Sequence, residues 1–558
     1  MPTLRSLLSS GGLLLTLACS AWAGSAEQVV ELPPLLVTES AKPLQWRYLE
    51  TKDFQVLFIC SDYLARDFVG NYHRLGQLMS LLVPEKFQVR MSVPLTLILF
   101  DDTEKRIIST EVIANMLKEE RARTTRKPSP EALGKLSFLP NMRLTDRDAV
   151  TAFALLDDAS EGSNLQFTRE HFVAAIAHRS PSLPLWLVHG LIELYTTVHY
   201  QEDRLVFSPA LWTSDEETRA LARDRDYPRA LLPLEEMLSL APADYRPNTD
   251  FARLWTVEAS LFVRWLHTAN HGARREALWK FVERLEQEPL SEALFRECFG
   301  LGYADARDRL SDYLPQAIED EFILKADKLE PCKPSKARLA TDAEVGRLRG
   351  EWERLEIQHV KKYYPALTGK YLEQARRTLN RAYEREARDP GFLAVYGLCE
   401  SEAGNTVRAR ELLEAATQAK VVRPLAYFEL ARLKFIEKTQ PGTAKLDDAA
   451  AAEILQLLQA GAEQNPALPE SYFLMAEVAM RRSGKPNSAE LAVLYHGAIL
   501  FPYTTPLVAR VISLHATQGL MEPARALVAL GLRNAPNEHD RKFYETLRTQ
   551  IAALEKAR

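Results

Sequence analysis

The stretch of residues 183–195, LPLWLVHGLIELY, decides the fold of the N-terminal half of this 558-residue chain. A second helical stretch, residues 168–173, precedes it and reads TREHFV. A proline-bearing turn separates the two helices. Within the later helix, His189 and Glu193 stand four residues apart and therefore share one helix face. The candidate chemistry of the chain lies on these two helices.

Residues 184–195 resemble the P-L-W-L-x-E-G-L-A-E-Y segment of gluzincin-like zinc peptidases, and in particular of the peptidase-MA-like domains. In that family the segment follows an H-E-x-x-H helix and supplies a glutamate as the third zinc ligand. The resemblance covers roughly residues 44–320 and is specific only in 184–195. It implies an α+β gluzincin-like metallopeptidase fold, which we place at residues 44–325.

The residues that would bind zinc in such a domain are replaced. Two histidines at i and i+4 on one helix face bind the metal, and the glutamate between them polarises a water. Against this pattern Glu170 takes the general-base position, while Arg169 and Val173 take the ligand positions. Neither can bind zinc, because arginine stays protonated and valine has no donor atom. His189 replaces the third ligand and Glu193 is kept, so the resemblance implies a vestigial base and no cofactor.

Two other arrangements of these residues remain open. A rebuilt zinc site could use three of four side chains across the turn: His171, His178, His189 and Glu193. The alternative function is therefore a zinc metallopeptidase with displaced ligands and Glu170 as general base. In the other arrangement, Arg169 occupies the former metal position and pairs with Glu193 and His189.

The first residues predict export. Arg5, the mostly apolar stretch 7–18 and the small-x-small pattern at 21–23 are typical of a signal peptide that ends at Ala23. Cys19 offers the alternative of a lipid anchor. No later stretch is long and apolar enough for a transmembrane helix. We therefore expect the periplasm or the cell envelope.

Strands come first along the chain and helices follow, which favours an α+β domain. Apolar runs predict strands at 46–50, 54–59, 94–100 and 149–156, and helical spacing predicts a helix at 62–83. From residue 164 onward almost everything is predicted helical. Residues 326–365 are predicted to be a linker, centred on 332–340, and a helix.

The C-terminal part, residues 366–558, has a repeat pattern. Prolines predicted to close successive helices lie 42, 36 and 34 residues apart: Pro424, Pro466, Pro502 and Pro536. Small residues recur where two helices of a unit would cross: Gly397, Ala409, Ala416, Ala524 and Gly531. This spacing resembles tetratricopeptide repeats, with an insertion around 438–445. It predicts an all-α solenoid that binds a protein or peptide partner.

The net charge, the cysteines and the absence of certain motifs argue against several other functions. The formal net charge of −5 favours neither nucleic acid nor an anionic membrane as partner. The chain has no Walker A, G-x-G-x-x-G or G-x-S-x-G motif. Four cysteines after the leader permit disulfides without forming a framework: Cys60, Cys298, Cys332 and Cys399. We expect an exported, non-catalytic protein-binding scaffold, with the oligomeric state left open.

Overall fold

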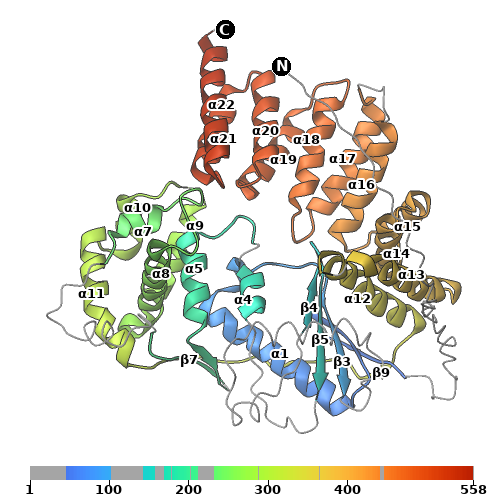
Figure 1. Ribbon diagram of the computed structural model, residues 1–558, viewed down its shortest axis with the longest axis horizontal. Coiled ribbons are helices and arrows are strands. Elements are labelled where there is room, and N and C mark those ends of the chain that lie inside the picture. Colours follow the sequence, from blue (N-terminus) through green and yellow to red (C-terminus); the bar gives the residue numbers. More distant parts are fainter. Residues whose placement is uncertain are drawn as a thin grey trace, which may run out of the picture. The chain divides into compact units, whose positions relative to one another are not determined.

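The computed structural model describes residues 45–101, 142–156, 169–176, 179–201, 203–210, 231–286, 288–363, 365–439 and 445–556 (Figure 1). The predicted signal peptide at 1–23, with Cys19, lies outside these residues. In the described part, no helix has the length and apolarity needed to cross a membrane.

The predicted N-terminal strands and helix are confirmed. They are β1 (Arg47–Glu50), β2 (Phe54–Phe58), α1 (Asp62–Leu82), β3 (Leu95–Asp101) and β5 (Val150–Leu156). With β4 (Met142–Thr145) and β9 (Arg338–Leu339) they form a sheet of order β4-β5-β3-β2-β1-β9. Strands β2, β3 and β5 are parallel, whereas β1, β4 and β9 pair antiparallel. Helix α1 connects the parallel pair β2 and β3, as such a crossover requires.

Helices cover both faces of this sheet, because neighbouring strand residues point to opposite sides. Val56 and Phe58 belong to a buried cluster with Phe68 of α1. Leu57, between them, belongs to a second cluster with Trp352 of α12 (Asp342–Tyr363). The sheet is thus packed between α1 and α12, although the two helices are far apart in sequence.

Beyond residue 164, where almost everything is predicted helical, the structure contains strands in two separate stretches. Three short strands form an antiparallel sheet of order β6-β7-β8: β6 (Val198–Tyr200), β7 (Arg204–Phe207) and β8 (Phe322–Lys325). Each has three or four residues, too few for alternation to be recognised against a helical background. The pairing of β7 with β8 joins segments that are distant in sequence, so it is decided by tertiary contacts.

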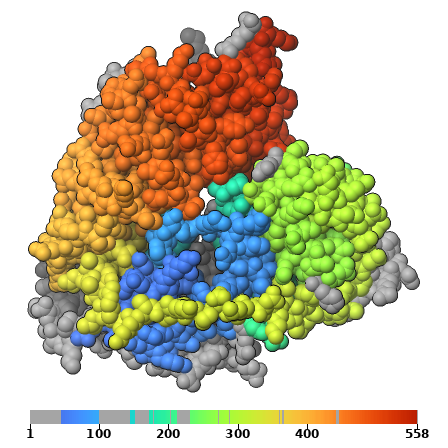
Figure 2. All heavy atoms as spheres, turned by 180° about the vertical axis from the view of Figure 1, so that it is seen from behind, coloured from blue at the N-terminus to red at the C-terminus, as the bar shows by residue number. Residues whose placement is uncertain are grey.

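The segment predicted as a linker is attached to the first sheet. The backbone N–H of Ser335 donates to the carbonyl of Glu50 at 2.7 Å, and β9 pairs with β1. In Figure 2 this segment, in yellow, runs along the blue surface of the N-terminal residues. The segment predicted as a linker therefore makes hydrogen bonds to the sheet.

Seven helices of the described residues share one buried cluster with the second, smaller sheet. They are α4 (Arg169–Ile176), α5 (Leu185–Tyr195), α7 (Leu234–Ser239), α8 (Asp250–Thr268), α9 (Arg275–Leu285), α10 (Glu292–Phe299) and α11 (Tyr303–Glu319). Their apolar faces meet in one cluster that contains Trp186, Trp255 and Phe262. The N-terminal half therefore combines strands and helices, while its specific likeness to gluzincins remains a prediction.

The predicted helical repeats are confirmed. After α12 and α13 (Thr368–Glu384), four helix pairs follow and a last helix covers the end. The pairs are α14 (Pro390–Glu402) with α15 (Thr406–Gln418), α16 (Pro424–Lys438) with α17 (Asp448–Ala462), α18 (Pro469–Arg481) with α19 (Ser488–Leu500), and α20 (Thr505–Thr517) with α21 (Met521–Asn534); α22 (Glu538–Lys556) is last. One buried cluster runs through all of them, as stacking of repeats requires.

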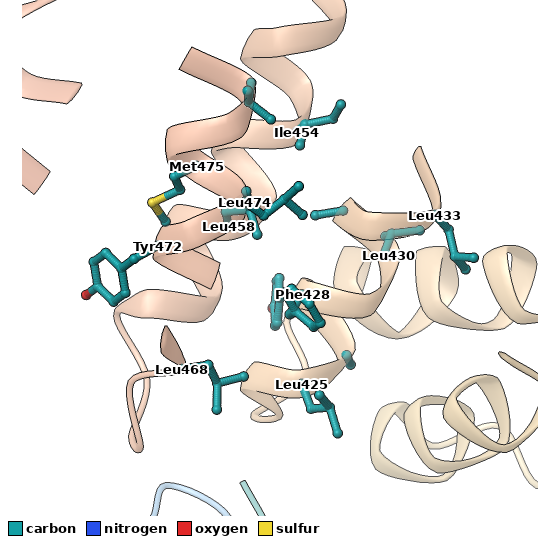
Figure 3. Packing of buried hydrophobic residues seen from close by; sticks show 14 of the residues in the cluster. Leu425, Phe428, Leu430, Leu433, Ile454, Leu458, Leu468, Tyr472, Leu474 and Met475 are labelled. Atoms are coloured by element: carbon teal, nitrogen blue, oxygen red, sulfur yellow. The ribbon is translucent and has the colours of Figure 1, made fainter. Parts of the chain in front are cut away.

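Glycines allow the two helices of a pair to pack closely against each other. A Cβ at Gly397 would lie 2.7 Å from Leu413 Cγ, so the glycine lets α14 and α15 cross closely. Gly404 and Gly519, with φ of 79° and 81°, end the first helices of two pairs in the left-handed conformation that glycine tolerates. Figure 3 shows side chains of α16, α17 and α18, among them Phe428 and Leu458, meeting between neighbouring pairs.

One detail of the proline pattern is corrected. Pro424 does not close a helix but stands in the first turn of α16. The first helices of all four pairs carry a proline there, where its missing N–H has no helical acceptor. Pro390 and Pro424 mark a 34-residue repeat, and the longer step to Pro469 reflects the predicted insertion.

Candidate functional site

The two helices that carry the predicted site are both present and pack together. Helix α4 begins at Arg169, and α5 contains His189 and Glu193. The rings of Phe172 and Tyr195 stack at 4.5 Å and hold α4 against α5.

Part of the predicted site falls outside the description. The side chains of Arg169, Glu170 and His171, and residue His178 as a whole, lie outside the described part of the chain. The vestigial base, the arginine pairing and the rebuilt zinc site therefore remain predictions. Val173, on the same helix, is half-buried.

His189 lies among aromatic rings. Its imidazole is 4.7 Å from the ring of Tyr245 and 5.4 Å from that of Trp255. Trp255 is itself fixed, because its indole N–H donates to the carbonyl of Met237 at 3.0 Å. The third-ligand position of the peptidase pattern is thus occupied by a half-buried imidazole in an aromatic environment.

Glu193, one turn further along α5, lines a cavity of about 20 Å³. Thr197, Ser260 and Arg264 line it as well. A cavity of this size accommodates about one water molecule and no substrate. A carboxylate that shares so small a cavity with an arginine is poorly placed to attract a cation.

Arg264 belongs to no sequence motif, yet it holds several elements of the structure together. It is buried within α8, and its guanidinium donates to the carbonyls of Ser208 at 2.6 Å and Asp320 at 3.1 Å, with a longer contact to Phe207 at 3.4 Å. These bonds join α8 to the ends of β7 and α11. An arginine in the otherwise apolar run from 261 to 266 is the signal that could have revealed it.

Helix packing requires the glycine at position 190 of the motif. A Cβ at this residue would lie 2.7 Å from the carbonyl oxygen of Ala259 and 2.9 Å from Val263 Cγ2. The backbones of α5 and α8 approach so closely here that only glycine fits. The glycine therefore serves helix packing beside the site, independently of any metal chemistry.

The described side chains do not assemble a metal site. Among them, no group of three His, Cys, Asp or Glu residues could hold a metal ion. His189 faces aromatic rings and Glu193 faces the cavity with Arg264, so these two donors do not fit a zinc site by themselves. The side chain of His171 and the whole of His178 lie outside the described residues, so the zinc site that would use them stays a prediction.

A second candidate is a surface of the repeats, here called the first-helix strip. It comprises Phe435 and Ile436 of α16, Phe473, Glu477, Met480 and Arg481 of α18, and Arg510 of α20. The guanidinium of Arg481 lies 5.6 Å from the Phe435 ring centroid, and that of Arg510 lies 4.3 Å from that of Phe473. Both arginines pair with Glu477. Three consecutive repeats are joined in this way along one face.

No protein-family model matches the chain, and no curated protein is similar to it. Several solved structures share a weak likeness with the chain, among them the following three. MamA is 15% identical over 30% of this chain and 89% of its own, with a TM-score of 0.24. TTC0263, described as a thermophilic TPR protein of Thermus thermophilus, is 17% identical over 36% and 98%, with a TM-score of 0.23. The APC/C hetero-tetramer Cut9–Hcn1 is 10% identical over 66% of both chains, with a TM-score of 0.23. The repeat architecture rests on the helix pairs and glycine crossings of this chain itself.

Proposed function

We propose that this protein is an exported, non-catalytic scaffold that binds a protein segment on the first-helix strip. In this proposal the peptidase-like helices α4 and α5 are retained for structure, and the repeats provide recognition. The replacement of two ligand positions by Arg169 and Val173 supports the loss of zinc chemistry.

The observation that carries the proposal is the exposure of two large apolar side chains on the strip. Ile436 is 52% exposed and Met480 is 51% exposed. Along the chain, Ile436 follows Phe435 on α16, and Met480 precedes Arg481 and stands two turns after Phe473 on α18. Apolar side chains framed by arginine and aromatic residues have the composition of protein-binding surfaces.

The test is site-specific crosslinking in the organism that makes the protein. A photoreactive residue at position 436 or 480 is expected to capture a defined protein, and Ile436→Asp together with Met480→Asp is expected to abolish its co-purification. The matched control is Val407→Asp, since Val407 is 62% exposed but lies on the second helix α15. Equal loss with the control, or the same products from a probe at 407, would contradict the proposal.

The loss of catalysis has a separate test. Purified mature protein is expected to contain no stoichiometric zinc and to cleave no peptide pool. Stoichiometric zinc that disappears in His189→Ala would instead favour the displaced-ligand metallopeptidase with Glu170 as base. Mass spectrometry of the mature N-terminus distinguishes cleavage after Ala23 from acylation of Cys19.

A further inference from the structure

A groove on the helical part of the N-terminal half contains two arginines with no acidic partner among the described residues. It has a volume of about 680 Å³ and lies between α8, α11 and the start of α9. Arg274 precedes α9, and Arg309 is exposed on α11. Asn270, Gln316 and Phe322 also line it.

Arg274 is held in a fixed orientation. Its guanidinium lies 4.5 Å from the ring centroid of Trp265, which is buried. Stacking on an indole uses the face of the guanidinium and leaves its N–H edge available for a planar acceptor. The groove therefore contains a positioned donor edge, beside a second cation.

The charge of Arg309 acts on Arg274. Burial and the nearby charge of Arg309 both lower the pKa of Arg274. On α9, by comparison, Arg284 has a carboxylate partner, Glu288, at 2.7 Å. A bound anion would relieve the repulsion between Arg274 and Arg309 in the way that a carboxylate does for Arg284.

The hydroxyl groups of the groove are already committed. Thr268 donates to the carbonyl of Arg264 at 2.8 Å, and the hydroxyl of Tyr313 is 2.6 Å from that of Thr268. Tyr313 therefore donates to Thr268. The remaining donors are the two guanidinium groups and the amides of Asn270 and Gln316, among the described residues.

We propose that this groove binds an acidic peptide segment through a carboxylate held between Arg274 and Arg309. The partly buried ring of Phe322 offers apolar contact to neighbouring side chains. Asp312 also lines the groove, and the whole chain has a net charge of −5. Both oppose a long polyanion such as nucleic acid more strongly than a short acidic peptide, because the repulsion grows with the number of negative charges brought to the surface. This inference does not depend on the first-helix strip.

The experiment is calorimetric titration of the full mature chain with acetylated tetraglutamate, inorganic phosphate and oligodeoxythymidine. Tetraglutamate is expected to bind the wild type and to bind Arg274→Gln/Arg309→Gln about tenfold more weakly or worse. Asp312→Asn is expected to bind it more tightly, because one repulsive charge is removed.

The matched control is Arg253→Gln/Arg296→Gln, which changes the net charge equally. Both of its arginines are exposed and pair with a carboxylate on their own helix. It is expected to bind tetraglutamate like the wild type. Absence of peptide binding to the wild type, binding of phosphate or oligonucleotide alone, or equal weakening in the control would overturn the proposal. The single exposed variant Arg309→Gln, with its thermal unfolding recorded, separates lost binding from lost folding.

Discussion

The carboxylate of Asp148 accepts a hydrogen bond of 2.7 Å from the backbone N–H of Leu425, which is 277 residues away in sequence. Asp148 lies on the turn between β4 and β5, and Leu425 lies in the first turn of α16. The other carboxylate oxygen is 3.0 Å from Nε of Arg423. A carboxylate of the sheet thus satisfies a helix N-terminus of the repeats, where a negative charge is favourable.

This contact belongs to a buried charge cluster, formed by Asp146, Asp148, Glu351, Arg354, Glu402 and Arg423. Glu351 of α12 lies 2.8 Å from both Arg354 and Arg423. Burial raises the pKa of Asp148 to about 6 despite Arg423. For Asp146, Arg354 and Arg423 outweigh burial and lower the pKa to about 2.

Asp148→Ala is expected to destabilise the protein by about 3–5 kcal/mol, because it leaves the buried Arg423 short of a partner. Asp148→Asn keeps an acceptor for the Leu425 N–H and is expected to cost less. The measurement is urea unfolding followed by tryptophan fluorescence. Asp203→Ala, at a half-exposed pair with Arg204, serves as control and is expected to cost much less than Asp148→Ala, because such pairs are screened by solvent. A cost for Asp148→Ala no larger than the control would contradict the role of the cluster.

Stability is expected to rise as the pH falls from about 8 to 5. Burial and the neighbouring Glu353 raise the pKa of Glu356 to about 8, and burial raises that of Glu258 to about 7. A carboxyl whose pKa is raised in the folded state favours folding when protonated, so its contribution is present below its unfolded pKa and is lost as the pH rises through the folded one. For Glu356 this loss is about 3 kcal/mol at pH 7.

At acid pH, by contrast, the stability is expected to fall as the pH falls. Asp146 has a lowered pKa, so its stabilising contribution is lost as the pH falls from about 4 to 2. The measurement is the free energy of unfolding between pH 3 and 8.5. Glu356→Gln mimics the protonated carboxyl and is expected to flatten the profile between pH 5 and 8. An unchanged profile in this variant would rule out Glu356 as its source.

Gly190→Ala is expected to destabilise the protein by about 1–3 kcal/mol, since the new Cβ would collide with the backbone of Ala259 and force α5 and α8 apart. The matched control is Gly70→Ala in α1, where a Cβ would meet nothing within 4 Å. That change is expected to stabilise the protein by up to about 1 kcal/mol through helix propensity. Thermal unfolding of both variants checks the opposite signs.

Arg264→Met is expected to be among the most damaging changes in the N-terminal half. It leaves the carbonyls of Ser208 and Asp320 without their donor in a partly buried site, at a cost of up to about 1–3 kcal/mol for an unsatisfied group. Arg264→Lys keeps the charge but not the fork of donors, so partial stability is expected. Proteolysis at the ends of β7 and α11 would report the local loosening, and a wild-type cleavage rate in Arg264→Met would contradict it.

The sequence by itself determined the elements whose signals are local. The periodicity of residues 62–83 and the apolar runs at 54–59 and 94–100 each predict their own helix or strand, because backbone preference and one-sided burial act over neighbouring residues. The prediction that Arg169 and Val173 stand at the ligand positions of a zinc-peptidase motif likewise comes from the sequence alone, and it remains a prediction.

Only the tertiary structure decided which distant residues meet. The pairing of β7 with β8, the fit of Gly190 against Ala259 and the bond from Leu425 to Asp148 join segments that carry no local sign of each other. The same holds for the groove, where Arg274 and Arg309 lack a shared motif. Burial in these places depends on the packing of whole helices, and a sequence pattern reports only the face that each helix offers.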